Sequence, residues 1–524
     1  MPDPHFEDLI LPANSRPQGL GELLSSLRRD SLSARNRYRS ILRDAAFVGA
    51  AGRAYARPLV ANERCGSWYV VPPGVAAASA TAAAAVEERD GEDEETAALG
   101  DGRFGVGTGS AYFKSTDGHE RAWKFSTRRL NLHVVRMVEE NDGVIIVDST
   151  RRGKRMPDAL STTVPIWCAV MNGYLLPSHP SSSSSSSPPE LHLPPSHSPS
   201  THAQISALLP SFLNSLRSLN LDSASLPRLT KPLRPFWVTP DSTLPDTSPP
   251  DEGEEAEEAE AEGESGSKST SGMKPLIFQD YRPVICCTAS ATVSSDADYV
   301  QGAADDAENW ARGLTPDVFW SHARELLAAP EDDQAALVAR LLAEDKVRAA
   351  QGGGDRLTRL TPRISVCPLP LGDGDGTAAA ATPAAAQIVL SAEAATPQDQ
   401  WIKSARRIEV GLGKNKNASK NLRLALPKIC DFVMKFLQKD GEDEKAQVVV
   451  ACESGRDLSV GTALAISCYL FDDEGNFRVP DKTISFTKTL VKVRLGHIMT
   501  QYPAGNPSRN TLQSVNSFLM DWRN

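Results

Sequence analysis

Short apolar runs along the chain alternate with longer segments that carry helix signals. Apolar runs predict β-strands at 67–71, 111–114, 144–147, 284–287, 388–390 and 447–450. Helices are expected at 20–44, 422–438 and 461–471, and another begins at Thr315-Pro316 and ends before Pro330. Strands that alternate with helices predict α/β architecture, in which ligands gather where strands end in loops.

Low-complexity stretches interrupt this pattern without ending it. They lie near 74–103, 178–203, 239–273, 348–356 and 371–386, and they are rich in Ala, Ser, Pro, Gly or acidic residues. Patterned sequence resumes directly after each, so we expect surface insertions that are disordered because they cannot bury enough apolar surface. The clearest boundary is expected near 371–400. It would separate an N-terminal α/β domain (1–370) from a second α/β domain (387–524).

Composition changes the picture in two respects. The 524 residues have 40% hydrophobic content, a formal net charge of −10 and eight scattered cysteines. Two tracts, 251–264 and 87–95, carry nine and seven acids, so the remaining chain is mildly basic and suited to nucleic acid. The cysteine spacing argues against a zinc site or a disulfide framework, and no apolar stretch is long enough for a membrane span. The cysteine pattern fits a reducing cytosol or nucleus, and we expect a cytoplasmic protein.

The segment AQVVVACESGRDLSVG (446–461) has the outline of a cysteine-phosphatase phosphate loop. The pattern in those enzymes is Cys-x-x-Gly-x-x-Arg-Ser/Thr, in which backbone N–H groups converge on an anion. Cys452, Gly455 and Ser459 fit, but Leu458 replaces the arginine that grips phosphoryl oxygens. The cradle, completed by Glu453, Ser454 and Arg456, is therefore predicted to keep anion binding and lose phosphatase chemistry.

Residues 144–155 (VIIVDSTRRGKR) place an acid and a basic loop at a strand end. Asp148 could hold ribose hydroxyls or Mg²⁺, while Arg151, Arg152 and Lys154 could neutralise a pyrophosphate. The other interpretation is a solvated basic turn or a localisation signal.

Residues 111–131 crowd polar groups at another strand end: Lys114, Ser115, Thr116, Asp117 and His119, followed by Lys124, Arg128 and Arg129. Hydroxyls, a carboxylate and an imidazole suit phosphate binding and proton transfer, although Asp-Gly also simply marks a turn. A third segment, 299–316, places Gln301 and Gly302 before Asp305 and Asp306. Small residues there allow a ligand to approach the backbone, and the acids could bind Mg²⁺ or take a proton; acids also favour helix N-termini.

Taken in order, these blocks resemble the initiator-tRNA 2′-O-ribosyl phosphate transferases of fungi and plants. The resemblance covers SLSARNRYRSILRDAAFV, LVANERCGSWYV, AYFKSTDGH, DSTRRGKRMPDALSTTVPIWCAVMN, ICCTAS, YVQGAADDAENWARGLTP and the CESGRDLS cradle. It implies an N-terminal α/β transferase domain with disordered insertions and a C-terminal dual-specificity-phosphatase-like α/β domain. It also implies transfer of a 5-phosphoribosyl group from 5-phosphoribosyl-1-pyrophosphate to the 2′-hydroxyl of adenosine 64 in initiator methionine tRNA, which keeps that tRNA out of elongation.

This chemistry needs a base for the 2′-hydroxyl and cations, including Mg²⁺, for the leaving pyrophosphate. Asp305 and Asp306 are the preferred bases, with Asp117 and His119 as alternatives; Lys114, Ser115, Thr116, Asp148, Arg151, Arg152, Lys154, Gln301 and Gly302 are candidates for substrate binding. RNA would be recognised by the shape of the T-stem and its 2′-hydroxyls. Phosphate contacts would come from the cradle, the basic helix at 20–44 and the basic stretch at 403–423. Two alternatives remain: a non-catalytic RNA-binding pseudo-phosphatase, and a cysteine phosphatase that uses Arg456.

Overall fold

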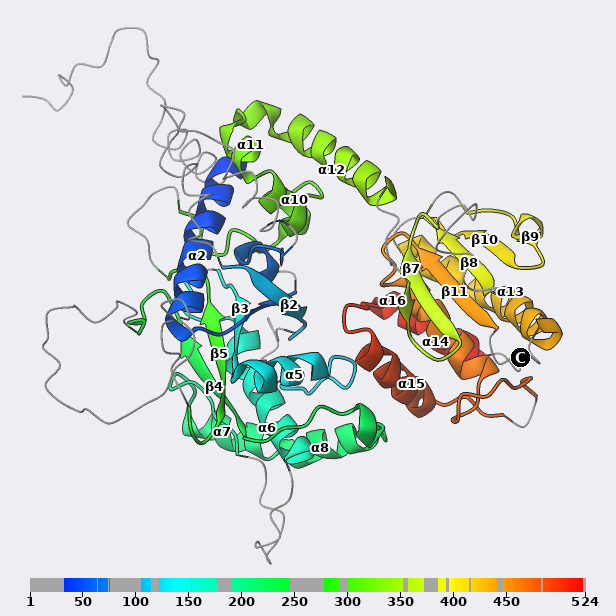
Figure 1. Ribbon diagram of the computed structural model, residues 1–524, viewed down its shortest axis with the longest axis horizontal. Coiled ribbons are helices and arrows are strands. Elements are labelled where there is room, and N and C mark those ends of the chain that lie inside the picture. Colours follow the sequence, from blue (N-terminus) through cyan, green and yellow to red (C-terminus); the bar gives the residue numbers. More distant parts are fainter. Residues whose placement is uncertain are drawn as a thin grey trace, which may run out of the picture.

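The chain folds into two α/β units that lie side by side, each with its own sheet (Figure 1). The computed structural model describes residues 33–63, 65–73, 75, 105–114, 122–151, 153–176, 190–245, 278–292, 299–351, 357–371, 385–392, 395–413, 416–440, 446–481 and 484–521.

The first unit is built on five parallel strands in the order β2-β1-β3-β5-β4. The strands are Leu59–Asn62 (β1), Gly107–Ala111 (β2), Val144–Asp148 (β3), Leu233–Val238 (β4) and Arg282–Thr288 (β5). The chain leaves β1 for β2 on one side and then returns to β3 on the other. The carboxyl ends of β1 and β3 therefore form a topological switch point, where α/β proteins bind ligands.

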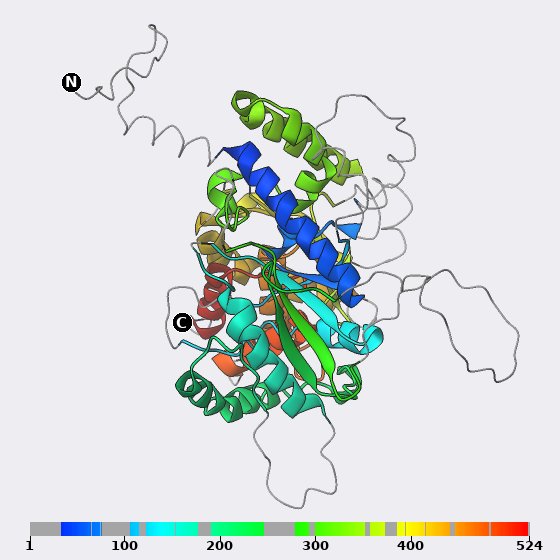
Figure 2. The ribbon, with the colours of Figure 1, turned by 90° about the vertical axis from the view of Figure 1, so that its left-hand side faces the viewer.

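Both faces of this sheet are covered, because successive side chains of a strand point to opposite sides. In β3, Val144 and Ile146 pack with one core, and Ile145 and Val147 pack with the other. Helices Leu132–Asn141 (α5), Val164–Leu175 (α6), Pro199–Ser206 (α7) and Leu209–Arg217 (α8) cover the first face. The opposite face carries Ala34–Tyr55 (α2), Gly66–Tyr69 (η1), Ala307–Trp310 (α9), Pro316–Ser321 (α10), Ala323–Ala328 (α11) and Gln334–Gln351 (α12). Figure 2 shows α2 crossing this side of the molecule.

The second unit has a six-stranded sheet in the order β6-β7-β11-β8-β10-β9. Its strands are Thr358–Arg359 (β6), Ile364–Pro368 (β7), Ala385–Ser391 (β8), Ile402–Ser404 (β9), Arg407–Gly411 (β10) and Gln447–Cys452 (β11); only the edge strands β6 and β9 pair antiparallel. Helices Lys416–Asp440 (α13), Leu458–Leu470 (α14), Lys488–Gln501 (α15) and Arg509–Asp521 (α16) share one large core with the sheet. Since β7 pairs with β11, the second unit begins before residue 364 and not at the expected 387.

Most strong periodic patterns are confirmed. Strands form at 144–147, 284–287, 388–390 and 447–450, and helices at 422–438 and 461–471. The strand predicted at 67–71 is wrong: Trp68 and Tyr69 are both buried, so burial does not alternate, and the segment forms η1. The strand predicted at 111–114 ends at Ala111, and the helix that starts at Pro316 breaks at His322. Helix α2 starts at Ala34 and runs on to Tyr55, beyond the predicted end at 44.

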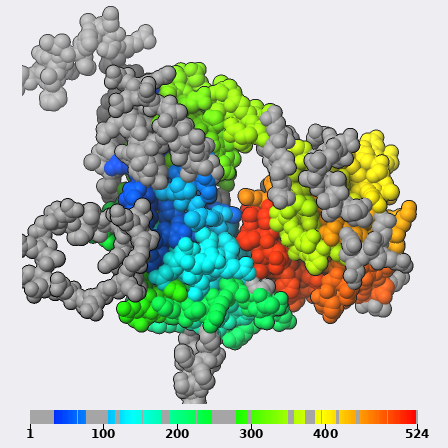
Figure 3. Space-filling model, viewed as in Figure 1, coloured from blue at the N-terminus to red at the C-terminus, as the bar shows by residue number. Residues whose placement is uncertain are grey.

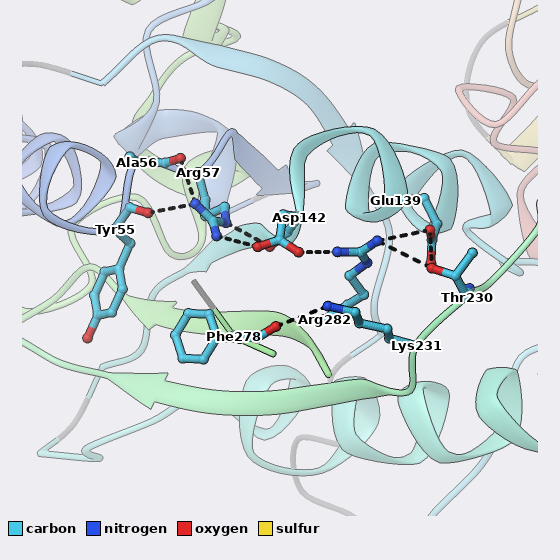
Figure 4. Close-up of polar contacts among 9 residues, drawn as sticks. All are labelled: Tyr55, Ala56, Arg57, Glu139, Asp142, Thr230, Lys231, Phe278 and Arg282. Carbon is cyan, nitrogen blue, oxygen red and sulfur yellow. Dashed lines mark hydrogen bonds and ion pairs between the residues drawn. The ribbon is translucent and has the colours of Figure 1, made fainter. Parts of the chain in front are cut away.

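An ion network closes the amino edge of the first sheet, at the opposite end of the strands from the switch point (Figure 4). Asp142 accepts a 2.8 Å hydrogen bond from Arg57 and is also bound by Arg282. Arg282 continues to Glu139 at 3.4 Å, and Glu139 accepts two 2.8 Å hydrogen bonds from Thr230. The network therefore ties the start of β5 to α5 and to the segment before β1.

The two units touch through α15 and the segment that follows it. His497 Nε2 on α15 lies 3.1 Å from the carbonyl oxygen of Leu219 in the first unit. In Figure 3 the red C-terminal part of the chain lies against the blue and cyan part of the first unit. Next to this contact, residues from both units line one cleft. The carboxyl ends of β1 and β3 form part of its wall.

Candidate functional site: a cationic cleft between the two units

Asn62 and Asp148, the last residues of β1 and β3, meet at the switch point. The Asn62 amide donates to Asp148 Oδ2 at 2.7 Å and to the Phe113 carbonyl at 3.1 Å, and its oxygen accepts from Phe113 N at 2.7 Å. Asp148 also accepts a 2.9 Å hydrogen bond from Ser149 N. Both side chains are almost completely buried. The amide therefore holds the carboxylate in one orientation at the end of the sheet.

These residues open into a cleft of about 900 Å³ between the units. The first unit contributes the ends of β1, β2 and β3 and residues 122–129, and the second contributes Leu495, Met499 and residues 506–509. Phe113 and Trp167, whose rings meet edge to face at 5.4 Å, add an apolar surface. A cavity of this size matches the usual range for small-molecule and cofactor sites.

Cations dominate the charged lining of the cleft. Lys114, Lys124, Arg128, Arg129 and Arg509 line it, against the acids Glu63 and Asp148. Lys114, Lys124, Arg128 and Arg509 are exposed, and no side-chain hydrogen bond or ion pair joins them to another residue in the described ranges. Converging cations with few acids create a positive potential, so the cleft is suited to an anionic ligand.

Glu63 is the half-buried acid of the cleft, one residue beyond β1. Burial raises the pKa of its carboxyl group, and the guanidinium groups of Arg129 and Arg456 and a hydrogen bond from Ser110 oppose that shift. A carboxylate with a raised pKa is a stronger proton acceptor than an ordinary one. The geometry thus offers a general base next to the Asn62–Asp148 pair.

The acid pair Asp305 and Asp306 lies elsewhere. Arg151 binds Asp306 and lies 3.8 Å from Asp305, so these carboxylates face the basic loop after β3 and do not line the cleft. Gln301 accepts from Gly153 N at 2.7 Å and donates to the Lys154 carbonyl at 3.0 Å. The 299–306 segment therefore clasps this loop.

Gly302 has the backbone conformation that this clasp requires, and its predicted contact with a ligand stays a prediction. It has φ +62°, and a Cβ there would lie 2.6 Å from the Thr150 carbonyl oxygen. Lys154 itself lies 3.7 Å from Asp158. Of the other predicted site residues, Ser115, Thr116, Asp117, His119 and Arg152 lie outside the described residues.

The predicted phosphate cradle follows β11 as expected; Cys452, Gly455 and Ser459 are buried, whereas Glu453, Ser454 and Arg456 are exposed. Cys452 is 2% exposed, belongs to the core and donates from Sγ to Ser459 Oγ at 3.2 Å. Glu453 accepts from Ala392 N at 3.2 Å, and the Ser454 hydroxyl accepts from Arg456 N at 3.2 Å. Arg456 is exposed, and Gly455 packs against the β7 end. Of the cradle residues, only Arg456 acts on the cleft, through its charge near Glu63.

Two basic segments expected to bind RNA partly serve the fold. In α2, Arg35 donates to the Ala329 carbonyl at 2.6 Å and Arg37 lies 5.3 Å from the Trp310 ring. In the 403–423 stretch, Arg407 pairs with Glu409 at 2.7 Å and Arg423 with Asp521 at 2.8 Å. The residues before 33 in the predicted basic helix lie outside the described part of the chain.

Comparisons with known proteins agree with this two-unit arrangement. The family model described as the Rit1 N-terminal domain matches residues 27–82 and 105–343, and the model described as the Rit1 DUSP-like domain matches 406–519. The chain belongs to the Rit1 family. It is 32% identical over 540 residues to the "tRNA A64-2'-O-ribosylphosphate transferase" of Saccharomyces cerevisiae, covering 96% of this chain and 95% of that protein.

A second relative of this chain is an uncharacterized protein of Schizosaccharomyces pombe. It is 32% identical over 509 residues, and the match covers 93% of this chain and 94% of the relative. Among solved structures, human DUSP28 matches at 15% identity and a TM-score of 0.22, covering 32% of this chain and 96% of that one. No helix in the described part of the chain is long and apolar enough to cross a membrane.

Sequence reasoning did not single out Asn62, Glu63, Tyr112 or Arg509. Asn62 ends a strand of only four residues and Glu63 follows it; this strand was too short to be recognised from its pattern. The block LVANERCGSWYV, which contributed to the family resemblance, contains both and was the available signal. No local signal marks Arg509, because only the docking of the second unit brings it to the cleft.

Proposed function

We propose that this Rit1-family chain transfers a 5-phosphoribosyl group from phosphoribosyl pyrophosphate to the 2′-hydroxyl of adenosine 64 in initiator methionine tRNA. Similarity over nearly the whole length to the yeast transferase supports the reaction class. The observation that carries the proposal is the cleft, where unpartnered cations surround Asp148 and Glu63. A donor with several phosphates needs such cations, and an attacking hydroxyl needs a carboxylate base.

In this proposal the carboxylate of Asp148 would hold the ribose of the donor or a Mg²⁺ ion, which would supply positive charge for the pyrophosphate. The described residues hold no group of three or more His, Cys, Asp or Glu that would cage a metal. Mg²⁺ commonly uses one or two protein carboxylates together with substrate phosphates, so the single carboxylate of Asp148 fits this role. Bound there, the ion would neutralise charge on the leaving pyrophosphate.

The reaction forms a bond between the 2′-oxygen of the tRNA and C1′ of the donor ribose, and it breaks the bond from C1′ to the pyrophosphate oxygen. Glu63 accepts the proton of the 2′-hydroxyl as that oxygen attacks. Lys114, Lys124 and Arg128 hold the phosphates and stabilise the charge that develops on pyrophosphate. The raised pKa of Glu63 makes it a stronger acceptor for the proton of the 2′-hydroxyl.

Recognition of the acceptor rests on RNA shape. The T-stem is a duplex whose deep groove hides its bases, so contacts go to phosphates and 2′-hydroxyls. The exposed cations of the cleft, with Arg456 beside it, supply positive charge for those phosphates. We place this reaction in the cytoplasm, where the initiator tRNA serves translation.

The test incubates the purified chain with initiator methionine tRNA, Mg²⁺ and phosphoribosyl pyrophosphate, and measures the mass of the tRNA. Mass gained by the initiator and not by elongator methionine tRNA is expected. Glu63→Gln should lower kcat by about 10² to 10⁴ and abolish the acid limb of the pH profile, since the rate rises as Glu63 deprotonates through its raised pKa.

Asp306→Asn distinguishes the two candidate bases. It should leave kcat nearly unchanged if Glu63 is the base, because Asp306 binds Arg151 away from the cleft. A large loss in Asp306→Asn with a normal Glu63→Gln enzyme would return the role to the acid pair. No mass gain on any tRNA by the wild-type chain would reject the transferase.

A further inference from the structure

The loop that would cradle phosphate in a cysteine phosphatase carries its own negative charge in this chain. Asp457 precedes α14, and Leu458 occupies the position of the phosphate-binding arginine. Asp457 Oδ1 accepts hydrogen bonds from Ser508 N at 2.8 Å and from Thr511 Oγ1 at 2.6 Å. Leu458 cannot bind phosphoryl oxygens, and the neighbouring carboxylate of Asp457 repels an anion, so the loop makes contacts with its own chain where a phosphatase binds phosphate.

Those contacts fix the segment between α15 and α16. Besides Asp457, the carbonyl oxygen of Arg456 accepts from Asn506 N at 2.7 Å, and Gly505 N donates to Tyr502 O at 3.0 Å. Thr511 is completely buried, so its hydrogen bond to a charged acceptor is shielded from water. The former phosphate loop thus determines where residues 502–509 lie.

The first unit holds the same segment from its other side. Arg129 donates to the carbonyl oxygens of Pro503 and Gly505 and to the side chain of Asn506, and its guanidinium lies 4.7 Å from the Tyr112 ring centroid. Segment 502–509 is therefore fixed between the two units.

This double anchorage brings Arg509 into the wall of the cleft. Arg509 is the first residue of α16 and is exposed, and in the described structure it has no hydrogen-bond or ion-pair partner. It lines the same cleft as Lys124 and Arg128 of the first unit. Bringing like charges from two units together costs energy unless an anion binds between them.

We infer that Arg509 is a phosphate-binding residue of the composite site, and that Asp457 is the positioning residue that holds it there. The phosphatase-like unit therefore supplies part of the binding site, while its own cradle binds no anion. The ligand is a phosphate group, either of the RNA backbone or of the pyrophosphate donor. This inference rests on the proposed function only for the identity of those two ligands.

Simple docking of the units does not need Arg509. The contact between His497 and Leu219 joins them independently, and Val493 of α15 packs against a core of the first unit. His497→Ala is therefore a control that weakens the interface without touching segment 502–509. Arg509→Lys tests whether a positive charge suffices, because lysine keeps the charge and loses the planar guanidinium.

The experiment uses the full chain and measures equilibrium binding of initiator tRNA and of labelled phosphoribosyl pyrophosphate, together with kcat and KM for each. Arg509→Gln and Asp457→Ala should each weaken one of the two ligands by about tenfold, with kcat within about twofold of wild type. The double variant should be no weaker than the worse single variant, because both remove one contact. Asp457→Asn, which keeps an acceptor oxygen, and Arg509→Lys should recover part of the loss.

The two binding measurements identify which ligand carries the phosphate, and they separate failure of this inference from failure of the proposed function. Weaker tRNA binding assigns Arg509 to the RNA backbone, and weaker donor binding assigns it to the pyrophosphate; either supports the inference. Arg509→Gln with wild-type affinity for both ligands overturns it, as does an equal loss in His497→Ala. A wild-type chain that binds both ligands but transfers nothing would reject the proposed function. The binding measurements on the Arg509 variants would still test the inference in that case.

Discussion

Replacement of Asn62 by alanine tests the idea that this amide sets the carboxylate of the site. In the variant, Phe113 N and O each lose a neutral hydrogen bond and Asp148 loses a charged one. A neutral bond contributes about 1 kcal/mol and a bond to a charged group about 2 kcal/mol. The free energy of unfolding should therefore fall by about 4 kcal/mol.

Asn172→Ala is the matched control. Asn172 on α6 makes the same two kinds of backbone bond, donating to Leu233 O at 2.9 Å and accepting from Leu233 N at 2.8 Å, and no ionised partner is among its hydrogen bonds in the described structure. Its loss should cost about 2 kcal/mol, so the two variants should differ by about 2 kcal/mol, the contribution of the bond to Asp148.

Urea unfolding followed by tryptophan fluorescence measures this difference, because six of the eight tryptophans belong to the first unit. Asn62→Ala should also lower kcat/KM for ribosyl phosphate transfer at least tenfold, since Asp148 is no longer oriented, whereas Asn172→Ala should keep it. Equal losses of stability, or a wild-type kcat/KM in Asn62→Ala, would refute the reasoning.

Three further predictions concern the frame around the site. Gly66→Ala should destabilise the chain by about 1–3 kcal/mol and impair transfer, because its Cβ would lie 2.0 Å from the Val147 carbonyl oxygen; Gly109→Ala, with 3.7 Å of room, should be nearly neutral in urea unfolding. Asp142→Ala should cost about 3–5 kcal/mol, measured by the same unfolding curves, because it leaves the buried Arg57 without its ion-pair partner and removes one of the two acids that Arg282 binds. Although burial opposes it, hydrogen bonds from Thr230 and Arg282 lower the pKa of Glu139. Its contribution should be present at neutral pH and lost as pH falls through that lowered pKa, a dependence that Glu139→Gln should flatten.

Elements with a continuous apolar run or a 3.6-residue repeat of apolar side chains were predictable from sequence, because both are local properties. The strand at 144–147 and the helices at 422–438 and 461–471 belong to this class. The strand prediction at 67–71 was wrong because three successive apolar residues, Trp68, Tyr69 and Val70, are all buried against the sheet, and a 3₁₀ turn buries them as well as a strand would. Strand β1 was not predicted, because four residues carry too little pattern to identify a strand.

Some candidate site residues could be identified from the sequence, whereas others were misplaced for the same reason. Asp148, Lys114, Lys124, Arg128 and Arg129 were noticed as polar groups at or after strand ends, and the fold brings them to one cleft. Asp305 and Asp306 were equally conspicuous in sequence, yet Arg151 neutralises them at a different position. Sequence alone has no measure of which charges are already paired.

By itself, the sequence determined the α/β class, the family, and a cysteine-centred loop that lacks its arginine, since each depends on neighbouring residues. Only the tertiary structure decided that this loop anchors residues 502–509, that Glu63 faces the cations, and that Arg509 reaches a cleft built mainly by the other unit. The physical reason is that burial and electrostatic partners depend on distances in space, and residues 63, 129 and 509 line one cleft only when the two units dock.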